Sequence, residues 1–346
     1  MYYPQGHAMT SPGVSHFHGL SAPPPGFFGT VPGYEGTVGG SGGGYLPPPI
    51  PMQPITPPQP NQELPNWNIP VLSEDEARKA FKEYVSDKCC YSSGPAEEGV
   101  ITNIEAFNTY RYRLETFTES RSTEWCYEPF TGQQVDAYMQ PAPGPWVISV
   151  QPPLMFEDTT KVVKVPYTSS VKDCHDCQGK GNQPCKKCSG AGNVRRECCS
   201  DCKGNGVKQC DVCKGKRQLL VYINLKVQWT NNKDDFVGEQ SGGLELAKLS
   251  KVSGKELFKD AQYMVYPLMG FPDPNVNQAS DRLIKEHWTK FSQAGRILQQ
   301  RHTVDLIPVT RVIYKWKEAC HTYFVYGNEN KVSTNDYPAT CCCTII

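Results

Sequence analysis

Four near-identical pieces follow one another in the middle of the chain: CHDCQGKG (174–181), CKKCSGAG (185–192), CSDCKGNG (199–206) and CDVCKGKR (210–217). Each has the form CxxCxGxG, except that Arg217 replaces the last glycine of the fourth piece. Two cysteines separated by two residues can place both sulfurs on one tetrahedral metal ion, and the glycines allow the positive φ angles that turn the backbone around it. Each piece therefore predicts half of a four-thiolate zinc site, and together the pieces predict two zinc ions per chain.

The spacing of the cysteine pairs predicts which pairs share a metal. Successive pairs begin 11, 14 and 11 residues apart, a palindromic spacing that suits a chain running out and back as a hairpin. Such a hairpin brings the outer pairs together and the inner pairs together. The expected ligands are Cys174, Cys177, Cys210 and Cys213 for one zinc ion, and Cys185, Cys188, Cys199 and Cys202 for the other. Sharing between neighbouring pairs, first with second and third with fourth, is the alternative.

Local charge agrees with metal binding in the repeat segment. Residues 171–217 hold 11 Lys or Arg against 5 Asp or Glu. Two zinc ions with eight thiolates carry about −4, so most of the basic surplus balances the metal centres and only about +2 is left to attract a nucleic acid. Redox chemistry at the CxxC pairs is one alternative use of the segment. Nucleic-acid binding is another, through Lys186, Lys187, Arg195 and Arg196.

The four pieces closely resemble the cysteine-rich zinc domain of the DnaJ (Hsp40) co-chaperones, in which the outer and inner repeats share the two metals. The resemblance covers about 44 residues, and it implies structural zinc and a chaperone-like role. Two departures stand out: Arg217 occupies a glycine position, and Cys198 lies beside the expected ligand Cys199. The chain contains no His-Pro-Asp tripeptide, so the resemblance does not extend to the J domain that stimulates Hsp70.

A wider resemblance covers roughly residues 65–340. The repeats lie between VPYTSSVKDC and RQLLVYINLKVQW, and PVTRVIYKWKEACHTYFVYGNENKV follows farther along the chain. This arrangement resembles the Ssu-two homolog family, DnaJ-type zinc proteins of animals. The resemblance implies that the zinc segment is carried by a larger folded region.

Strand patterns lie on both sides of the repeats. In LLVYINLKVQW (219–229), apolar and polar residues alternate, as in a strand that buries one face. Shorter strand patterns precede the repeats at 146–150 and 161–167, and two more strands are expected within 304–326. The repeat segment is therefore expected to be an insertion that projects from a β-rich domain.

Two helices are expected outside the repeats. The first covers roughly 73–88, where Ser73 and Glu76 form a capping box. The second covers 280–291, with His287 on its apolar face. The fold class is α+β, a β-rich domain with an inserted DnaJ-type two-zinc cysteine-rich hairpin and a disordered Pro/Gly-rich N-terminal tail. The expected parts are 1–65 (tail), 66–170 (helix and β-rich region), 171–217 (cysteine-rich domain), 218–337 (β-rich α+β region completing the main domain) and 338–346 (flexible tail).

The composition of residues 1–65 predicts disorder. They contain 27 Gly or Pro, no Lys or Arg, and only two acids. This composition raises the cost of ordering the backbone and offers little surface to bury. A PxxP spacing occurs at 48–51 and at 54–57, so docking to an SH3 or WW domain is the alternative to a solvated tail.

The two ends of the chain predict its compartment. MYYPQGHAMT has neither the basic nor the apolar segment of a secretory signal, so a cytoplasmic protein is expected, with the nucleus as the alternative. In a reducing compartment, 16 cysteines favour metal binding or lipidation over disulfides. The last four residues, CTII, fit the C-a-a-X pattern for prenylation of Cys343, and Cys341 and Cys342 precede it as candidate palmitoyl acceptors. Ile346 favours geranylgeranyl, and lipidation would hold the protein at the cytosolic face of a membrane; an unmodified tail is the alternative.

The sequence favours a non-enzymatic function. Its seven histidines are scattered, it lacks the GxxxxGK[ST] and GxSxG motifs, and its 35 basic residues equal its 35 acidic residues. We therefore expect a zinc-stabilised protein-interaction or chaperone-like protein whose partners are other polypeptides or unfolded clients. A thiol-disulfide oxidoreductase and a nucleic-acid-binding zinc protein are the alternatives.

Overall fold

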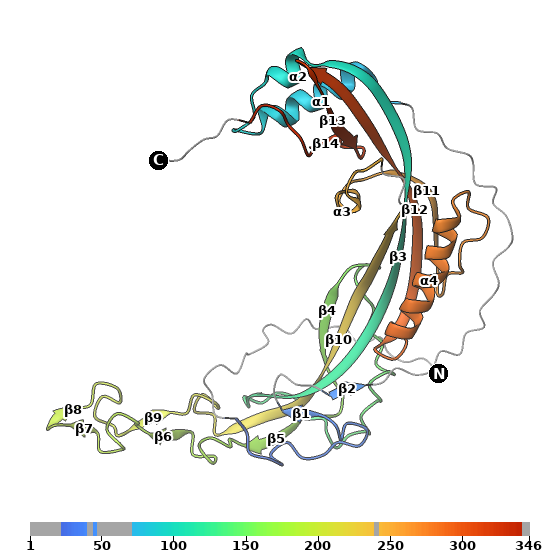
Figure 1. The fold of residues 1–346 in the computed structure, drawn as a ribbon. Helices are drawn as coiled ribbons and strands as arrows, with labels where there is room; N and C mark the ends of the chain where they lie inside the picture. The colour runs from blue at the N-terminus through green and yellow to red at the C-terminus, as the bar shows by residue number, and fades with distance from the viewer. Residues whose placement is uncertain (1–21, 40–43, 47–70, 239–241, 341–346) are drawn as a thin grey trace. The chain divides into compact units, whose positions relative to one another are not determined.

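The computed structural model describes residues 22–39, 44–46, 71–238 and 242–340 (Figure 1). In this part of the chain the protein is β-rich with few helices, as the sequence predicts. The helices are α1 (Glu74–Ser86), α2 (Gly94–Glu98), α3 (Leu246–Leu249) and α4 (Pro274–Phe291). The strands are β1 (Val38–Gly39), β2 (Gly44–Leu46), β3 (Val100–Pro129), β4 (Thr159–Lys164), β5 (Ser170–Asp173), β6 (Asn182–Pro184), β7 (Asn193–Val194), β8 (Glu197–Cys198), β9 (Val207–Gln209), β10 (Gln218–Val237), β11 (Lys255–Gln262), β12 (Arg296–Trp316), β13 (Ala319–Tyr326) and β14 (Lys331–Thr334).

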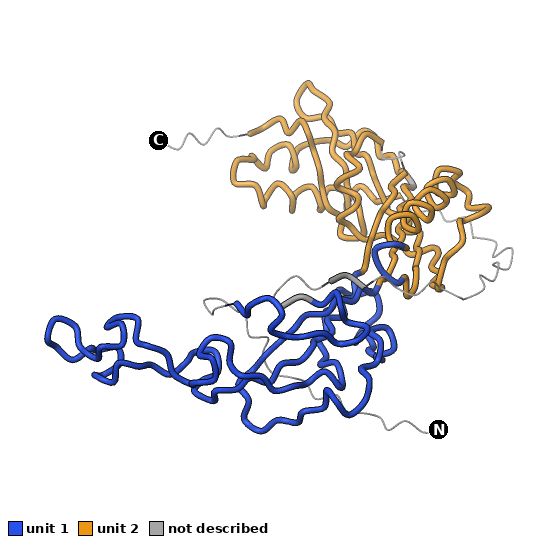
Figure 2. The backbone as a smooth tube through the Cα atoms, turned by 90° about the horizontal axis from the view of Figure 1, so that it is seen from below, with its two compact units in different colours: residues 1–50, 119–230, 293–296 blue, residues 51–118, 231–292, 297–346 orange. Residues whose placement is uncertain are grey.

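Most of the strands belong to one sheet, whose main path is β14-β13-β12-β3-β10-β4. In addition, β1 and β2 pair with β3, β5 pairs with β10, and β11 pairs with β12, while β6-β9 and β7-β8 form two small ribbons. The chain forms two compact units, drawn in different colours in Figure 2. Unit 1 comprises residues 1–50, 119–230 and 293–296, and unit 2 comprises residues 51–118, 231–292 and 297–346.

In unit 2, helix α1 confirms the first predicted helix. The Ser73 side chain accepts a hydrogen bond from the Glu76 backbone N–H, and the Glu76 carboxylate accepts one in return from the Ser73 N–H. The helix buries its apolar stripe against β12 and β13, where Phe81 stacks on Tyr323 with ring centroids 4.0 Å apart. The buried residues of the stripe are Ala77, Ala80, Phe81 and Val85.

The second predicted helix is longer than its apolar pattern indicates. Helix α4 begins at Pro274, which fixes a helical φ at the first position, and Asp273 caps it by accepting from the Asn275 N–H. His287 is 1% exposed, as expected for a core histidine. Its Nδ1 lies 2.7 Å from Thr116 Oγ1 and its Nε2 lies 2.8 Å from Asp234 Oδ2, so both ring nitrogens are engaged in unit 2.

In unit 1, strand β10 follows the alternation read from the sequence. Val221, Ile223, Leu225, Val227 and Trp229 are all fully buried. On the opposite side of the same stretch, Lys226 and Gln228 are exposed. Strand β10 pairs antiparallel with β4 and β5, and β5 leads directly into the cysteine repeats.

The strand expected at 146–150 does not form. This segment is irregular, and the Arg121 guanidinium binds the carbonyl oxygens of Pro145 and Ile148. Arg121 also lies over the Trp146 ring, 4.8 Å from its centroid. The guanidinium of an arginine on β3 therefore binds carbonyl groups that would otherwise accept hydrogen bonds from a neighbouring strand.

Part of the expected N-terminal tail is ordered, which corrects the prediction of disorder over 1–65. Strand β1 pairs parallel with β3 and β2 pairs antiparallel with it. Tyr34 is 3% exposed, and its hydroxyl donates to the Pro143 carbonyl at 2.6 Å. The prediction failed because average composition conceals a few aromatic anchors in a Gly/Pro-rich segment. The remainder of 1–65, including both PxxP matches, lies outside the described residues.

No helix within the described ranges combines the length and the apolar character needed to span a bilayer.

Candidate metal centres

The four repeats form a hairpin in unit 1 whose paired segments follow one another outward. At its base β5 pairs with β10, in its middle β6 pairs with β9, and at its tip β7 pairs with β8 (Figure 1). The register runs from Asp173↔Gln218 through Asn182↔Gln209 to Asn193↔Cys198. Such an out-and-back path places the first repeat beside the fourth, and the second beside the third.

The eight repeat cysteines gather into two groups of four, which we call site 1 (Cys174, Cys177, Cys210 and Cys213) and site 2 (Cys185, Cys188, Cys199 and Cys202). All eight side chains are buried. In site 1 the Sγ atoms of Cys174 and Cys210 lie 3.8 Å apart and those of Cys177 and Cys213 lie 3.6 Å apart. The corresponding pairs of site 2 have the same separations of 3.8 and 3.6 Å.

These separations suit a metal and exclude disulfides. Four sulfurs placed tetrahedrally at the usual zinc–sulfur distance of about 2.3 Å lie about 3.8 Å from one another. Bonded sulfurs lie only about 2.05 Å apart. The two groups fit the hairpin pairing of outer with outer and inner with inner, and each group can hold one zinc ion.

Backbone hydrogen bonds join the repeats in the same pairs. The Cys174 N–H donates to the Arg217 carbonyl at 2.8 Å, and the Cys210 N–H donates to the Gly181 carbonyl at 2.9 Å. In site 2 the same reciprocal bonds link Cys185 to Gly206 and Cys199 to Gly192, both at 2.9 Å. The first cysteine of every repeat thus donates a backbone hydrogen bond to the last residue of its partner repeat. These bonds pair the repeats independently of any metal.

The first and second repeats also turn a backbone N–H toward their own sulfur. The Gly181 N–H lies 3.1 Å from Cys177 Sγ and the Gly192 N–H lies 3.3 Å from Cys188 Sγ. Three positions in each repeat have positive φ, namely the residue after the second cysteine, the following glycine and the last residue. This common conformation explains the spacing of the glycines, because it points backbone donors at the thiolates.

The last position of a repeat depends on which site it belongs to. A Cβ on Gly192 would lie 2.5 Å from the Gly204 carbonyl oxygen, and one on Gly206 would lie 2.4 Å from that of Gly190. At Gly181 in site 1 the same approach is 3.0 Å. The wider spacing in site 1 explains how Arg217, with φ of 71°, fills the equivalent position of the fourth repeat.

The electrostatics differ from one cysteine to the next: burial raises the pKa of Cys174 and of Cys202 to about 11, whereas other positions favour the thiolate. The Cys202 backbone N–H lowers the pKa of Cys199 to about 7, against the opposing effect of burial. Burial raises the pKa of Cys177, but the Gly181 N–H and the neighbouring sulfurs outweigh it and lower that pKa. The thiolate is the form that binds metal. The neighbouring Cys198 is exposed and does not belong to either group, so the structure places Cys199 rather than Cys198 in site 2.

The two sites differ in what surrounds them. Site 1 is part of an apolar cluster that includes Val212, Leu219 and Val221, and Phe27, Phe28 and Tyr127 pack against that cluster. Among the hydrophobic side chains that the structure describes, only Val194 packs against the cysteines of site 2. Site 1 therefore joins the hairpin to the core of unit 1, whereas site 2 holds the outer part of the hairpin.

The basic residues of the nucleic-acid alternative lie around site 2. Lys187 Nζ lies 3.3 Å from Asp201 Oδ1, and Lys208 binds the same carboxylate. Lys186, Arg195 and Arg196 are exposed. At least one of the four cations proposed to contact a nucleic acid is thus engaged by an acid of the hairpin itself.

The candidate lipidation residues Cys341, Cys342 and Cys343 lie outside the described residues. The described chain ends at Thr340, which is exposed and forms an antiparallel bridge with Tyr91. The backbone N–H of Ser92 donates to the Ala339 carbonyl at 2.9 Å. The chain therefore reaches residue 340 at the surface of unit 2.

Together, the sheet and the hairpin define a class: a β-rich protein that carries an inserted two-centre cysteine hairpin able to bind metal. The chain is 58% identical to "Protein SSUH2 homolog" of Danio rerio, over 97% of this chain and 99% of that protein. It therefore belongs to the SSUH2 homolog family, which confirms the wider resemblance read from the sequence. A Homo sapiens protein of the same name is 37% identical over 93% of each chain. The Mus musculus protein is 36% identical over 68% of this chain and 77% of its own. No family model and no solved structure matches the chain.

Proposed function

We propose that this protein is a non-enzymatic, zinc-stabilised interaction protein that holds other polypeptides in a chaperone-like manner. In this proposal the hairpin is of the DnaJ type and works without a J domain, so it does not activate Hsp70. The observation that carries the proposal is the enclosure of all eight repeat cysteines in two buried four-sulfur groups. A four-cysteine site that uses all its positions for protein ligands is structural, because it leaves no open position for a substrate.

The same observation weighs against redox catalysis by the CxxC pairs. A catalytic thiol must be accessible and free to attack, whereas a thiolate bound to zinc is neither. Here the sulfurs of different repeats face one another across each group at 3.6 to 3.8 Å. The arrangement supports a role in holding the hairpin, and the binding of partners then falls to the surfaces that the hairpin and the sheet present.

The direct test is whether the full chain holds an unfolded client without ATP. A chemically denatured model enzyme is diluted into buffer and its aggregation is followed by light scattering. The intact protein is expected to suppress scattering, and protein stripped of metal by a chelator is expected to lose that effect. Equal scattering with and without the intact protein would refute the proposal.

We further propose that lipidation of Cys343 tethers the protein to a cytosolic membrane face. The exposed exit of the chain at Thr340 supports this, because a modifying enzyme needs an accessible C-terminus. A prenyl group holds a protein weakly by itself, so acylation of Cys341 or Cys342 would supply the second signal. Cys343→Ser is expected to shift the protein from the membrane fraction of cells to the supernatant; an unchanged partition would exclude lipidation at this site.

A further inference from the structure

Residues 22–39 and 44–46, which we call the strap, cover the part of β3 that lies nearest the base of the hairpin. Val38 pairs with Glu124 and Gly39 with Trp125 through β1. Strand β2 continues along the same stretch, from Gly44↔Thr123 to Leu46↔Arg121. In the sheet β3 lies between β12 and β10, and the strap takes an edge of β3 only at residues 121–125. Without the strap, this edge would present unpaired backbone groups, which readily accept an added strand.

The strap also places two adjacent aromatic side chains on an aromatic surface. Phe28 stacks on Trp125, with centroids 5.3 Å apart and planes within 11°. Phe27 meets the edge of His175, next in sequence to the site 1 ligand Cys174, at 5.0 Å. The surface is formed by Trp125, Tyr127, His175 and Val212, at the point where site 1 joins the sheet.

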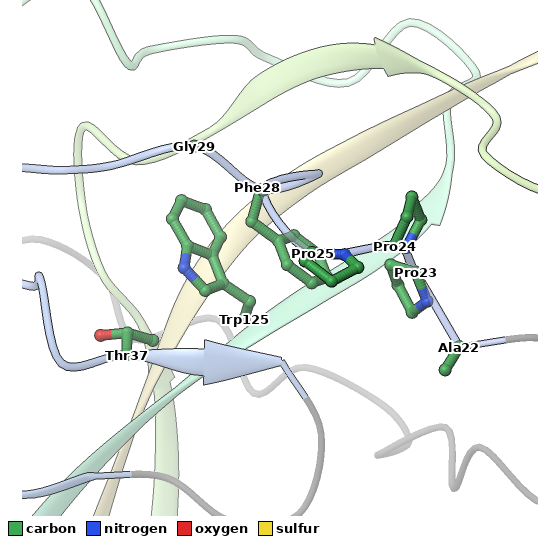
Figure 3. A pocket seen from close by; sticks show the side chains of 9 residues that line it. Ala22, Pro23, Pro24, Pro25, Phe28, Gly29, Thr37 and Trp125 are labelled. Carbon is green, nitrogen blue, oxygen red and sulfur yellow. The ribbon is translucent and has the colours of Figure 1, made fainter.

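A pocket of about 350 Å³ remains beside these contacts, lined by the proline run 23–25, Phe28, Thr37 and Trp125 (Figure 3). Beneath the strap, Nε2 of His175 is buried and has no hydrogen-bond partner among the described residues. Apart from Trp125, the residues that line the pocket belong to the strap, so the pocket is a gap that the strap leaves where it meets Trp125. The strap also leaves the His175 Nε2 without a partner among the described residues, and a different peptide could use that atom.

The strap is held by few anchors. Only Tyr34 is buried among residues 22–37, while Phe27, Phe28 and Thr37 are partly exposed. Among the described residues, two side-chain hydrogen bonds link it to the rest of unit 1, from the Tyr34 hydroxyl to the Pro143 carbonyl and between the Thr37 and Thr123 hydroxyls at 2.8 Å. Segments with so little buried surface open more easily than the core to which they attach.

We propose that the surface under the strap is a docking site for an extended polypeptide that carries two adjacent aromatic residues after a proline. The strap, with its sequence PPPGFF, occupies this site as a competitor within the same chain. The partner would add a strand to the β3 edge and place its aromatic pair against Trp125 and His175, a mode in which main-chain bonds give affinity and side-chain pockets give specificity. This inference rests on the proposed function, for which it names the binding surface.

Covalent attachment gives the strap an advantage over any free partner. A tethered segment acts at an effective concentration on the order of millimolar, so a free peptide of equal intrinsic affinity is largely excluded. Loosening the strap should therefore reveal the site to a peptide in solution. The best available probe is the strap itself, because its sequence is known to fit.

The experiment uses the full chain and a fluorescent peptide, APPPGFFGTVPGYEGTVG, that copies residues 22–39. Binding is followed by anisotropy. The double variant Phe27→Ala/Phe28→Ala is expected to bind the peptide at least tenfold more tightly than the unchanged chain. A peptide with both phenylalanines replaced by alanine should not bind. Tyr138→Ala, which alters a side chain of unit 1 that is 92% exposed, should bind no better than the unchanged chain.

A milder variant guards against misfolding. Tyr34→Phe removes only the hydrogen bond to Pro143. Its affinity for the peptide should lie between that of the unchanged chain and that of the double variant. If both variants retain their metal and neither binds the peptide better than the unchanged chain, the docking site is wrong. Client holding by the unchanged chain, measured separately, would then still support the proposed function.

Discussion

Among single residues, the last position of each repeat has the same backbone conformation in both sites. The space available for a side chain at this position differs between the two sites. Gly206 and Arg217 have nearly the same φ, 70° and 71°. A side chain is tolerated at Arg217 in site 1, whereas a Cβ on Gly206 would lie 2.4 Å from a carbonyl oxygen. The conformation itself costs a non-glycine residue about 1–2 kcal/mol, and the contact adds to that cost only in site 2.

We predict that Gly206→Ala weakens site 2 while Arg217→Gly leaves site 1 intact. The alanine methyl would push Gly190 away and disturb the N–H donors around Cys188 and Cys202. Release of metal to a chromogenic chelator should be at least tenfold faster for Gly206→Ala and unchanged or slower for Arg217→Gly. Similar release from Gly206→Ala and the unchanged protein would show that the close approach is not limiting.

His302 in unit 2 is 2% exposed. Burial lowers the pKa of this histidine to about 4, although Asp260 opposes the shift. Because the unfolded histidine titrates near 6.5, the unfolded state binds a proton first as pH falls, and stability decreases from about pH 6.5 toward pH 4. The loss attributable to His302 is on the order of 3 kcal/mol.

The substitution His302→Gln should remove that part of the pH dependence. Urea denaturation of both proteins at pH 7 and pH 4.5 gives the comparison, and the difference between the two proteins isolates His302 from metal loss, which affects both. A pH dependence unaltered by the substitution would mean that the folded histidine is protonated as easily as the unfolded one.

At the scale of elements, the hairpin is divided by its surroundings into a base and a tip. Site 1 packs with Leu219 and Val221 of β10, whereas Val194 is the one hydrophobic side chain in the described ranges that packs on site 2. A structural zinc ion contributes about 10–16 kcal/mol in small peptides that lack a core. The tip should depend almost entirely on its metal, and the base should depend on both metal and core.

Paired substitutions test this division. Cys188→Ser should expose the amides of β7 and β8 to hydrogen exchange and leave β5 and β10 protected, because site 1 stays closed. Cys177→Ser should speed exchange in β5, in the adjoining residues of β10 and in the strap, which packs on site 1. Identical exchange patterns for the two variants would show that the hairpin unfolds as one piece.

At the scale of the whole molecule, local patterns could be predicted from the sequence and long-range pairings could not. The eight cysteines were identifiable because CxxC spacing and the palindromic repeat are properties of neighbouring residues. The capping box at Ser73 and the alternation in β10 were readable for the same reason. The strap was missed because its order depends on Phe28 meeting Trp125, nearly one hundred residues away in sequence.

The failure at 146–150 has a similar origin. An apolar run read as a strand becomes irregular when Arg121 takes the Pro145 and Ile148 carbonyls. No local signal announces that an arginine on another strand will do this. The division of the chain into two units, each assembled from separate stretches, likewise reflects contacts between distant residues.

We infer that two closed zinc sites, rather than reactive cysteine pairs, organise this protein. The most direct measurement is elemental analysis of the full chain purified without added metal, combined with mass spectrometry after maleimide labelling. We predict two zinc ions per chain and eight repeat cysteines that react only after chelation. Cys198→Ser should retain both ions and Cys199→Ser should lose one. One ion or none in the unchanged chain, or rapid labelling of the repeat cysteines, would contradict the claim.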